Sequence, residues 1–169
     1  KSAKDVVLML VDIVSKNGNL LLNVPVRGDG TIDEKEVAVV EGIAAWMDIN
    51  KESIFNTRPW TRFGEGPSAD KSNPINAQGF NEGRTRYSAA DIRFNVNGKD
   101  LYVTLMGVPE NDILVKSLSS TVKTNKIRKV VLLGSTEKVQ WKQTSEGLKI
   151  VKPAAIPNTI ALVYKVTLK

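Results

Sequence analysis

Four acidic side chains between positions 29 and 36 are the residues of this chain with the most evident catalytic potential. Two carboxylates can cleave a glycosidic bond when they face each other across a cleft. These four instead cluster at the start of a predicted helix, where the positive end of the helix dipole already accounts for negative charge. We therefore predict no catalytic residue in this chain. The four residues are Asp29, Asp33, Glu34 and Glu36.

The same segment has the spacing of the second half of a calcium-binding EF-hand loop. In the sequence GDGTIDEKE at positions 28–36, two aspartates, a glycine and a final glutamate fall at the expected intervals. The first ligand positions would fall on Pro25 and Arg27, which carry no carboxylate. We therefore predict no metal site here, and we interpret the segment as a tight turn that leads into a capped helix.

Residue types that are missing from the chain exclude several kinds of site. The chain has no cysteine, which excludes disulfides, thiolate catalysis and zinc–cysteine clusters. It also has no histidine, which excludes a Ser-His-Asp triad and imidazole metal ligands. Neither the G-x-G-x-x-G pattern nor the P-loop occurs, so no phosphate-binding loop is predicted.

Positive charge is concentrated in the C-terminal half, where residues 86–169 hold 14 basic and 6 acidic residues. Such a balance can indicate a nucleic-acid-binding protein. The tightest cluster, KTNKIRK at residues 123–129, contains no aromatic side chain that could stack on bases. We interpret it as a solvated strand edge protected by lysines, and we predict no nucleic-acid partner. No apolar run is long enough to span a bilayer, so no membrane partner is predicted.

The first 50 residues predict a helix, a buried strand and a second helix. The first helix, residues 2–16, is apolar on almost all sides and ends at Asn17-Gly18. Residues 20–24, LLLNV, are apolar on both faces, which is typical of a parallel sheet covered by helices. Because a single strand leaves its backbone groups unpaired, we interpret this segment as the tail of a larger α/β domain.

The second predicted helix spans residues 33–50 and has an apolar stripe that we expect to face a core. Trp46 lies at helical spacing and is predicted to be a core residue. The residues of the stripe are Val37, Val40, Ile43, Ala44 and Met47.

Residues 88–169 predict an all-β antiparallel sandwich. Apolar residues alternate along residues 92–96, and Asn97-Gly98 then has the sequence of a hairpin turn. About seven short strands separated by turns are typical of this architecture. Before them, residues 63–84 are rich in glycine and proline and predict a long loop. The later strands are predicted from residue 101 and near residues 112–118, 126–134, 138–143, 147–151 and 159–168.

The chain resembles the C-terminal part of the α-L-fucosidases, a family of retaining glycoside hydrolases. SKNGNLLLN at residues 15–23 resembles the last barrel strand of that family and its approach, and NKESIFNTRPW at residues 50–60 follows the last helix. The motifs that resemble the C-terminal sandwich of the family are DLYV at 100–103, LMGVP at 105–109, IRKVVLLG at 127–134, VQW at 139–141 and GLKI at 147–150.

The resemblance implies a fold of two parts. Residues 1–60 would be an α/β barrel tail, the last helix–strand–helix of a (β/α)8-like catalytic barrel. Residues 61–87 would be a connector loop, and residues 88–169 the C-terminal β-sandwich domain. The aspartate nucleophile and the carboxylic acid/base of such an enzyme would lie upstream, so the chain alone is predicted to be inactive. The resemblance also implies that no cofactor is needed.

Asn23 and Arg27 are the substrate-binding candidates that the resemblance suggests. They would lie at the C-terminal end of the last barrel strand, the face on which barrel active sites form. A plain structural turn is the alternative interpretation of the loop at residues 25–30. The implied partners are a fucosylated glycan, bound through the parent enzyme, and the remainder of the barrel domain or another copy of this chain. A bacterial parent would be periplasmic or secreted.

A second hypothesis is that the β-rich part is a stand-alone carbohydrate-binding or interaction module. An exposed Trp141 or Tyr102 in a shallow groove would support that hypothesis. Burial of both side chains in the sandwich would oppose it.

Overall fold

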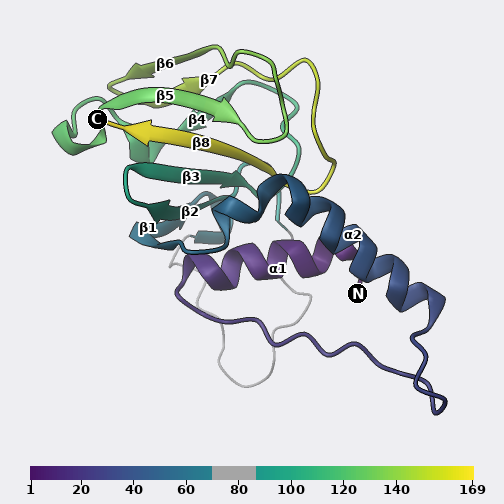
Figure 1. The fold of residues 1–169 in the computed structure, drawn as a ribbon. Helices are drawn as coiled ribbons and strands as arrows, with labels where there is room; N and C mark the ends of the chain where they lie inside the picture. Colours follow the sequence, from purple (N-terminus) through teal and green to yellow (C-terminus); the bar gives the residue numbers. More distant parts are fainter. Residues whose placement is uncertain (70–86) are drawn as a thin grey trace.

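An antiparallel sheet of five strands forms the middle layer of the structure, a computed structural model that describes residues 1–69 and 87–169 (Figure 1). Its strand order is β1-β2-β3-β8-β5, and a second sheet has the order β4-β7-β6. The elements are α1 (Ala3–Ser15), α2 (Glu34–Asn50), β1 (Arg58–Glu65), β2 (Ile92–Asn97), β3 (Asp100–Leu105), β4 (Ile113–Val115), β5 (Ile127–Leu132), β6 (Trp141–Thr144), β7 (Gly147–Ile150) and β8 (Leu162–Leu168).

Each face of the five-stranded sheet contributes to a separate hydrophobic core, because side chains alternate along its strands. On β3 and β8, Val103 and Tyr164 face the three-stranded sheet, whereas Tyr102 and Val163 face the helices. The core between the sheets is the interior of the predicted β-sandwich. The second core is closed by α1 and α2, so the fold has three layers.

Both helices begin and end where the sequence predicts. Ser2 caps α1 in a capping box with Asp5: the hydroxyl of Ser2 accepts a hydrogen bond from the backbone N–H of Asp5, and the carboxylate of Asp5 accepts one from the backbone N–H of Ser2. Asn17, with φ of 66°, provides the left-handed residue that ends this helix. Asp33 caps α2 by accepting a hydrogen bond from the backbone N–H of Lys35 at 2.9 Å. Trp46 is buried as predicted.

The strands β2 to β8 form where the sequence predicts, and both sheets are antiparallel. Gly98, with φ of 59°, lies in the hairpin turn between β2 and β3. The cluster at residues 123–129 overlaps β5, an edge strand on which Arg128 and Lys129 are exposed. This position agrees with the interpretation as a strand edge protected by positive charge.

Strand β1 is absent from the sequence prediction. It pairs with the outer edge of β2, and the register shifts between Pro59 and Gly64. A proline is tolerated at a sheet edge, where its missing N–H disrupts no central ladder. Because the register shifts within β1, its buried and exposed residues do not alternate regularly. Its sequence therefore lacks the alternation of apolar residues by which a strand is recognised. Of the predicted connector, residues 70–86 lie outside the described part of the chain.

The predicted strand at residues 20–24 is not formed, which corrects the expectation of a buried strand here. These residues have irregular backbone, and Leu21 is 95% exposed. Nothing in the described part of the chain supplies the neighbouring parallel strand that such a segment needs. Part of the predicted apolar stripe of α2 is exposed as well, namely Val37, Val40 and Ala44.

Neither helix in the described residues has the length and hydropathy needed to cross a membrane.

Trp46 joins α2 to the sheet through a hydrogen bond as well as through its buried ring. Its indole N–H donates to the carbonyl oxygen of Ala161 at 3.1 Å. We expect Trp46→Phe to lower the free energy of unfolding by about 1–3 kcal/mol, because it leaves that buried carbonyl without its donor. Urea denaturation measures the change. Phe55→Leu, at a side chain that is 59% exposed, is the control and should cost less than about 0.5 kcal/mol. Equal effects of the two substitutions would contradict this account.

Asp91 is a buried carboxylate immediately before β2. It accepts hydrogen bonds from the backbone N–H of Ser68 at 2.6 Å and from the backbone N–H of Ser88 at 2.9 Å. Burial raises the pKa of Asp91, but these hydrogen bonds outweigh burial and hold the pKa below its ordinary value.

The lowered pKa of Asp91 makes its contribution to stability dependent on pH. The contribution is complete above the unfolded pKa of about 4, and is lost as the pH falls through the lower folded pKa. Asp91→Asn should therefore destabilise the protein at neutral pH, and this penalty should shrink on acidification. Urea denaturation of both proteins across the acidic range measures the difference, and a penalty that stays constant with pH would contradict the assignment.

Candidate functional site

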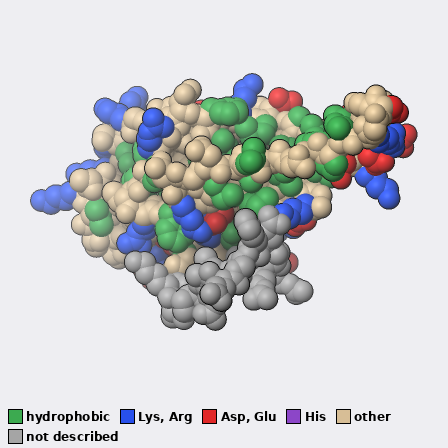
Figure 2. Space-filling model, turned by 90° about the horizontal axis from the view of Figure 1, so that it is seen from below, with side chains coloured by type: hydrophobic (Ala, Val, Ile, Leu, Met, Phe, Trp, Pro, Cys, Tyr) green, Lys and Arg blue, Asp and Glu red, His purple; other side chains and the backbone are tan. Residues whose placement is uncertain are grey.

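The loop that holds Asn23 and Arg27 leaves α1 at Asn17 and enters α2 at Asp33. It runs away from the sheets and reaches the tip beside the start of α2 (Figure 1). Asn23 and Arg27 are both exposed. At this end of the molecule Figure 2 shows hydrophobic side chains among acidic and basic ones. The exposed apolar residues of the loop include Val26, which is 65% exposed.

A tight turn sets the position of Arg27. Its backbone N–H donates to the carbonyl of Thr31 at 2.7 Å, and its carbonyl accepts from the N–H of Gly30 at 2.9 Å. The carboxylate of Asp29 accepts from the hydroxyl and the backbone N–H of Thr31, which lowers the pKa of Asp29. Asp29 is therefore engaged within the turn that we predicted for this segment.

The guanidinium group of Arg27 contacts the carboxylate of Asp33 at 2.8 Å. The backbone N–H of Lys35, and then Arg27, hold the pKa of Asp33 below its ordinary value. About half of each side chain in this ion pair is exposed, so the pair contributes little to stability. Arg27 can exchange Asp33 for another anionic or hydroxylated partner at low cost. No contact among the described residues joins it to Asn23.

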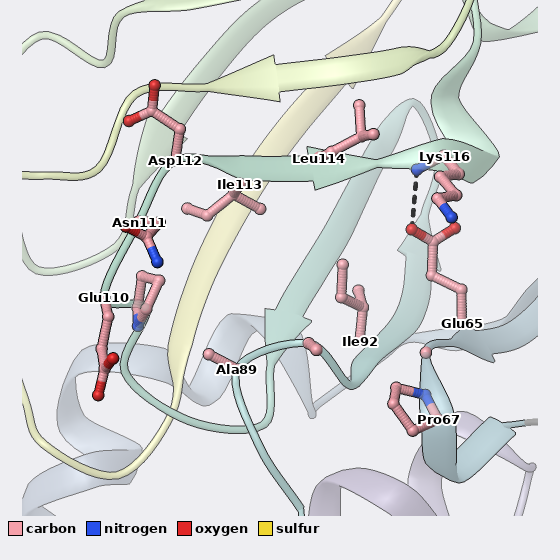
Figure 3. A pocket seen from close by; sticks show the side chains of 13 residues that line it. Glu65, Pro67, Ala89, Ile92, Glu110, Asn111, Asp112, Ile113, Leu114 and Lys116 are labelled. Atoms are coloured by element: carbon pink, nitrogen blue, oxygen red, sulfur yellow. Dashed lines mark hydrogen bonds between the residues drawn. The ribbon is translucent and has the colours of Figure 1, made fainter.

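A pocket of about 440 Å³ lies beside the end of β1 and the start of β4 (Figure 3). The carboxylate of Glu65 accepts hydrogen bonds from the backbone N–H groups of Lys116 and Ser117, each at 2.8 Å. Figure 3 shows Glu110 and Asp112 at the other end of the pocket, pointing in opposite directions. These acids do not form the facing pair that glycosidic cleavage needs.

Of the two residues that could have supported a stand-alone binding module, Tyr102 is buried and Trp141 is partly buried. Tyr102 is 3% exposed, and its hydroxyl group donates to Glu52 at 3.1 Å. Trp141 is partly buried and packs against the core between the sheets. The burial of Tyr102 and the partial burial of Trp141 oppose the second hypothesis.

A buried ion pair between α1 and the five-stranded sheet was missed by the sequence analysis. Arg93 on β2 is 1% exposed, and its Nε donates to the carboxylate of Asp12 on α1 at 2.6 Å. Its other guanidinium nitrogens donate to Ser68 and to a main-chain carbonyl. The rings of Phe63 and Tyr87 lie 5.3 and 5.4 Å from the guanidinium carbon. The sequence did contain a signal for this buried charge, because Arg93 lies between the apolar residues Ile92 and Phe94 of a predicted strand.

Two family models match this chain in succession. The model described as alpha-L-fucosidase matches residues 1–52, and the model described as alpha-L-fucosidase C-terminal domain matches residues 87–169. Tissue alpha-L-fucosidase of Bos taurus is 28% identical over 164 residues, which cover 94% of this chain and 30% of that protein. The chain thus spans about a third of the length of the relatives that it matches.

Solved structures resemble the whole chain. The crystal structure of Thermotoga maritima alpha-fucosidase has a TM-score of 0.71 and 26% identity, and the match covers 99% of this chain and 35% of that one. Alpha-L-fucosidase isoenzyme 1 from Paenibacillus thiaminolyticus has a TM-score of 0.72 and shares the fold at 23% identity, with coverage of 100% and 35%.

We expect Asp12→Ala to lower the free energy of unfolding by about 3 kcal/mol, because it leaves the Arg93 guanidinium buried without its partner. Asp48→Ala, at an exposed aspartate of α2, should change it by less than about 0.5 kcal/mol. Replacing both partners by apolar residues, as in Asp12→Leu with Arg93→Met, should recover most of the loss. Thermal and urea denaturation of the two single variants and the double variant measure these changes in the free energy of unfolding. A double variant no more stable than Asp12→Ala would contradict the assignment.

Proposed function

We propose, because this chain belongs to the α-L-fucosidase family as its C-terminal part, that the whole protein removes terminal α-L-fucose from glycans with retention of configuration. The observation that carries the proposal is the order of the two family matches along one chain, the first to the enzyme and the second to its C-terminal domain. The Thermotoga maritima alpha-fucosidase supports it, since it aligns with 99% of this chain over 35% of its own length at 26% identity.

In this proposal the catalytic carboxylates lie in the part of the whole protein that precedes this chain. A retaining glycosidase needs two carboxyl groups about 5 Å apart. The acids at residues 29–36 serve the turn and the start of α2, and those of the pocket in Figure 3 point apart. The chain alone is therefore proposed to be inactive.

We further propose that residues 1–60 are the end of a catalytic α/β barrel, that residues 61–87 connect it to the sandwich, and that residues 88–169 are the C-terminal domain. Strand β1 (Arg58–Glu65) crosses the first of these boundaries and belongs to the five-stranded sheet, so the connection begins with a strand of that sheet. The exposure of Leu21 and Leu22, at 95% and 40%, supports the barrel interpretation. Leucines on both faces of a segment are typical of a strand enclosed by helices. Residues 20–24 would pair with neighbouring barrel strands, and these strands or another copy of this chain would cover the exposed leucines.

Asn23 and Arg27 are our proposed substrate-binding residues. If residues 20–24 form the last barrel strand, Asn23 lies at its C-terminal end and Arg27 just beyond it, on the face where barrel enzymes bind their substrates. Arg27 supplies several N–H donors, and its weak pairing with Asp33 leaves them available to sugar hydroxyl groups. The fucosylated glycan is the proposed partner at this position.

We expect the whole protein to hydrolyse an aryl α-L-fucoside and the 169-residue chain to show no turnover. In the whole protein, Arg27→Ala or Asn23→Ala should raise KM by roughly tenfold through the loss of hydrogen bonds to the sugar. Arg128→Ala, at an exposed arginine of the sandwich, is the matched control and should leave KM unchanged.

Steady-state kinetics separates these expectations. Turnover that scales with the concentration of the purified chain would refute the proposed location of the carboxylates. A KM that is the same for Arg27→Ala and Arg128→Ala would refute the role of Arg27.

A further inference from the structure

Six basic side chains gather at one end of the sandwich, which we call the basic end. All six are exposed, and none of them forms an ion pair with another described residue. Figure 2 shows basic side chains at this end of the molecule, and the acidic ones that are visible lie nearer the middle and the opposite end. The basic end consists of Lys99, Lys123, Lys126, Arg128, Lys129 and Lys169.

Backbone hydrogen bonds between segments that are distant in sequence bring three of these lysines together. The N–H of Lys169 donates to the carbonyl of Lys126 at 2.8 Å, and the N–H of Leu168 donates to the carbonyl of Lys99 at 2.9 Å. These residues lie at the start of β3, at the start of β5 and at the end of β8, which are neighbours in the five-stranded sheet. The sheet therefore fixes where this positive charge lies.

A bulge and a short helix add the other three basic residues. The register of β5 against β8 shifts between Ile127 and Lys129. Arg128 and Lys129 are therefore both exposed, although successive residues of a regular strand point to opposite faces. Lys123 begins the 3₁₀ helix Lys123–Asn125, which precedes β5. The side-chain amide of Asn125 holds this helix on the sandwich by donating to a main-chain carbonyl at 3.0 Å.

Protection of a sheet edge explains only part of this charge. Basic residues on an edge strand prevent it from pairing with another chain, and Arg128 and Lys129 on β5 serve that role. Lys99 and Lys169 instead adjoin β3 and β8, which are inner strands of the sheet. Because like charges repel one another in a compact fold, their concentration here indicates a partner of opposite charge.

The acidic groups at this end leave the positive charge in excess. Asp100 pairs with Lys165, at 3.3 Å between Oδ2 and Nζ. Glu146, in the turn between β6 and β7, pairs with Lys149 at 2.5 Å. The terminal carboxylate of Lys169 adds one negative charge against the six positive ones. The basic end therefore attracts anions, and its attraction is greatest for a ligand with many negative charges.

The residue types of the basic end favour a sulfated glycan over a nucleic acid. Five of its six residues are lysines, whereas arginine is the residue best suited to nucleic-acid recognition. None of the six is aromatic, so the surface has no ring that could stack on a base. A sulfated polysaccharide carries sulfate groups along its whole length, and these can pair with several separate ammonium groups at once.

We propose that the basic end binds a sulfated polysaccharide through ion pairs with its sulfate groups. The choice of a glycan rests on the proposed function, in which the whole protein acts on fucosylated glycans. Binding itself requires no catalytic carboxylate and no contact with Arg27, whose loop lies at the opposite end of the molecule (Figure 1). Binding is measured on this chain and turnover on the whole protein, so failure of one proposal is distinguishable from failure of the other.

The test measures the dissociation constant of the 169-residue chain for a heparin oligosaccharide by calorimetry. We expect binding that weakens as the salt concentration rises, because each ion pair releases counterions from the sulfated chain. Reversal of three charges together, by Lys123→Glu, Lys126→Glu and Arg128→Glu, should raise the dissociation constant by about tenfold or more. Absence of binding by the wild-type chain at low salt would overturn the proposal.

The matched control reverses three exposed lysines away from the basic end, by Lys4→Glu, Lys35→Glu and Lys138→Glu. This variant has the same net charge as the first one, and it should bind the heparin oligosaccharide as the wild-type chain does. Equal weakening in the two triple variants would overturn the proposal, because it would show a response to net charge alone.

Glutamine at the first three positions keeps the test valid if charge reversal disturbs folding. This variant should melt at the temperature of the wild-type chain, because it changes only exposed side chains that form no ion pair. It should still bind the heparin oligosaccharide more weakly than the wild-type chain, and unchanged affinity would overturn the proposal.

Two further polyanions test the class of ligand. Hyaluronan carries carboxylate groups and no sulfate, and a DNA duplex carries phosphates. We expect the chain to bind both of them more weakly than a heparin oligosaccharide of similar length at the same salt concentration. Equal or tighter binding of either one would overturn the assignment to a sulfated glycan.

Discussion

The ion pair between the buried guanidinium group of Arg93 and the carboxylate of Asp12 is the interaction on which the arrangement of this molecule depends. A charge that is 1% exposed requires a partner, and Asp12 on α1 provides it at 2.6 Å. The interaction therefore fixes the first helix against the five-stranded sheet. Phe63 and Tyr87 exclude water from the guanidinium group by packing their rings against it. Segments matched by two different family models thus share the ion pairs Asp12–Arg93 and Glu52–Lys165 and one hydrophobic core.

The function that we propose depends on this attachment. The five-stranded sheet packs on the three-stranded sheet through one face and on the helices through the other (Figure 1). The loop between the helices then extends from a fixed base and carries Asn23 and Arg27. A loop of an active site needs such a rigid support, because binding groups must be held in position. In this account the sandwich supports the last part of the barrel.

Prediction from the sequence succeeded where a signal was local. Asn17 marked the end of the first helix and Asp33 the start of the second, and alternating apolar residues marked β2, β3 and β8. It failed where the outcome depended on contacts distant in sequence. The irregular pairing of β1 conceals its strand pattern, and the partner of Arg93 lies 81 residues away. The turn that positions Arg27 was predicted, but its pairing with Asp33 was not.

The central claim is that this chain is the end of a fucosidase barrel held on its sandwich, and residues 20–24 test it most directly. Hydrogen exchange should be measured for these amides in the 169-residue chain and in the whole protein. The account predicts rapid exchange in the chain, where the segment pairs with no strand of the described residues, and strong protection in the whole protein. Rapid exchange in both would contradict it, because an enclosed barrel strand cannot leave its amides open to solvent.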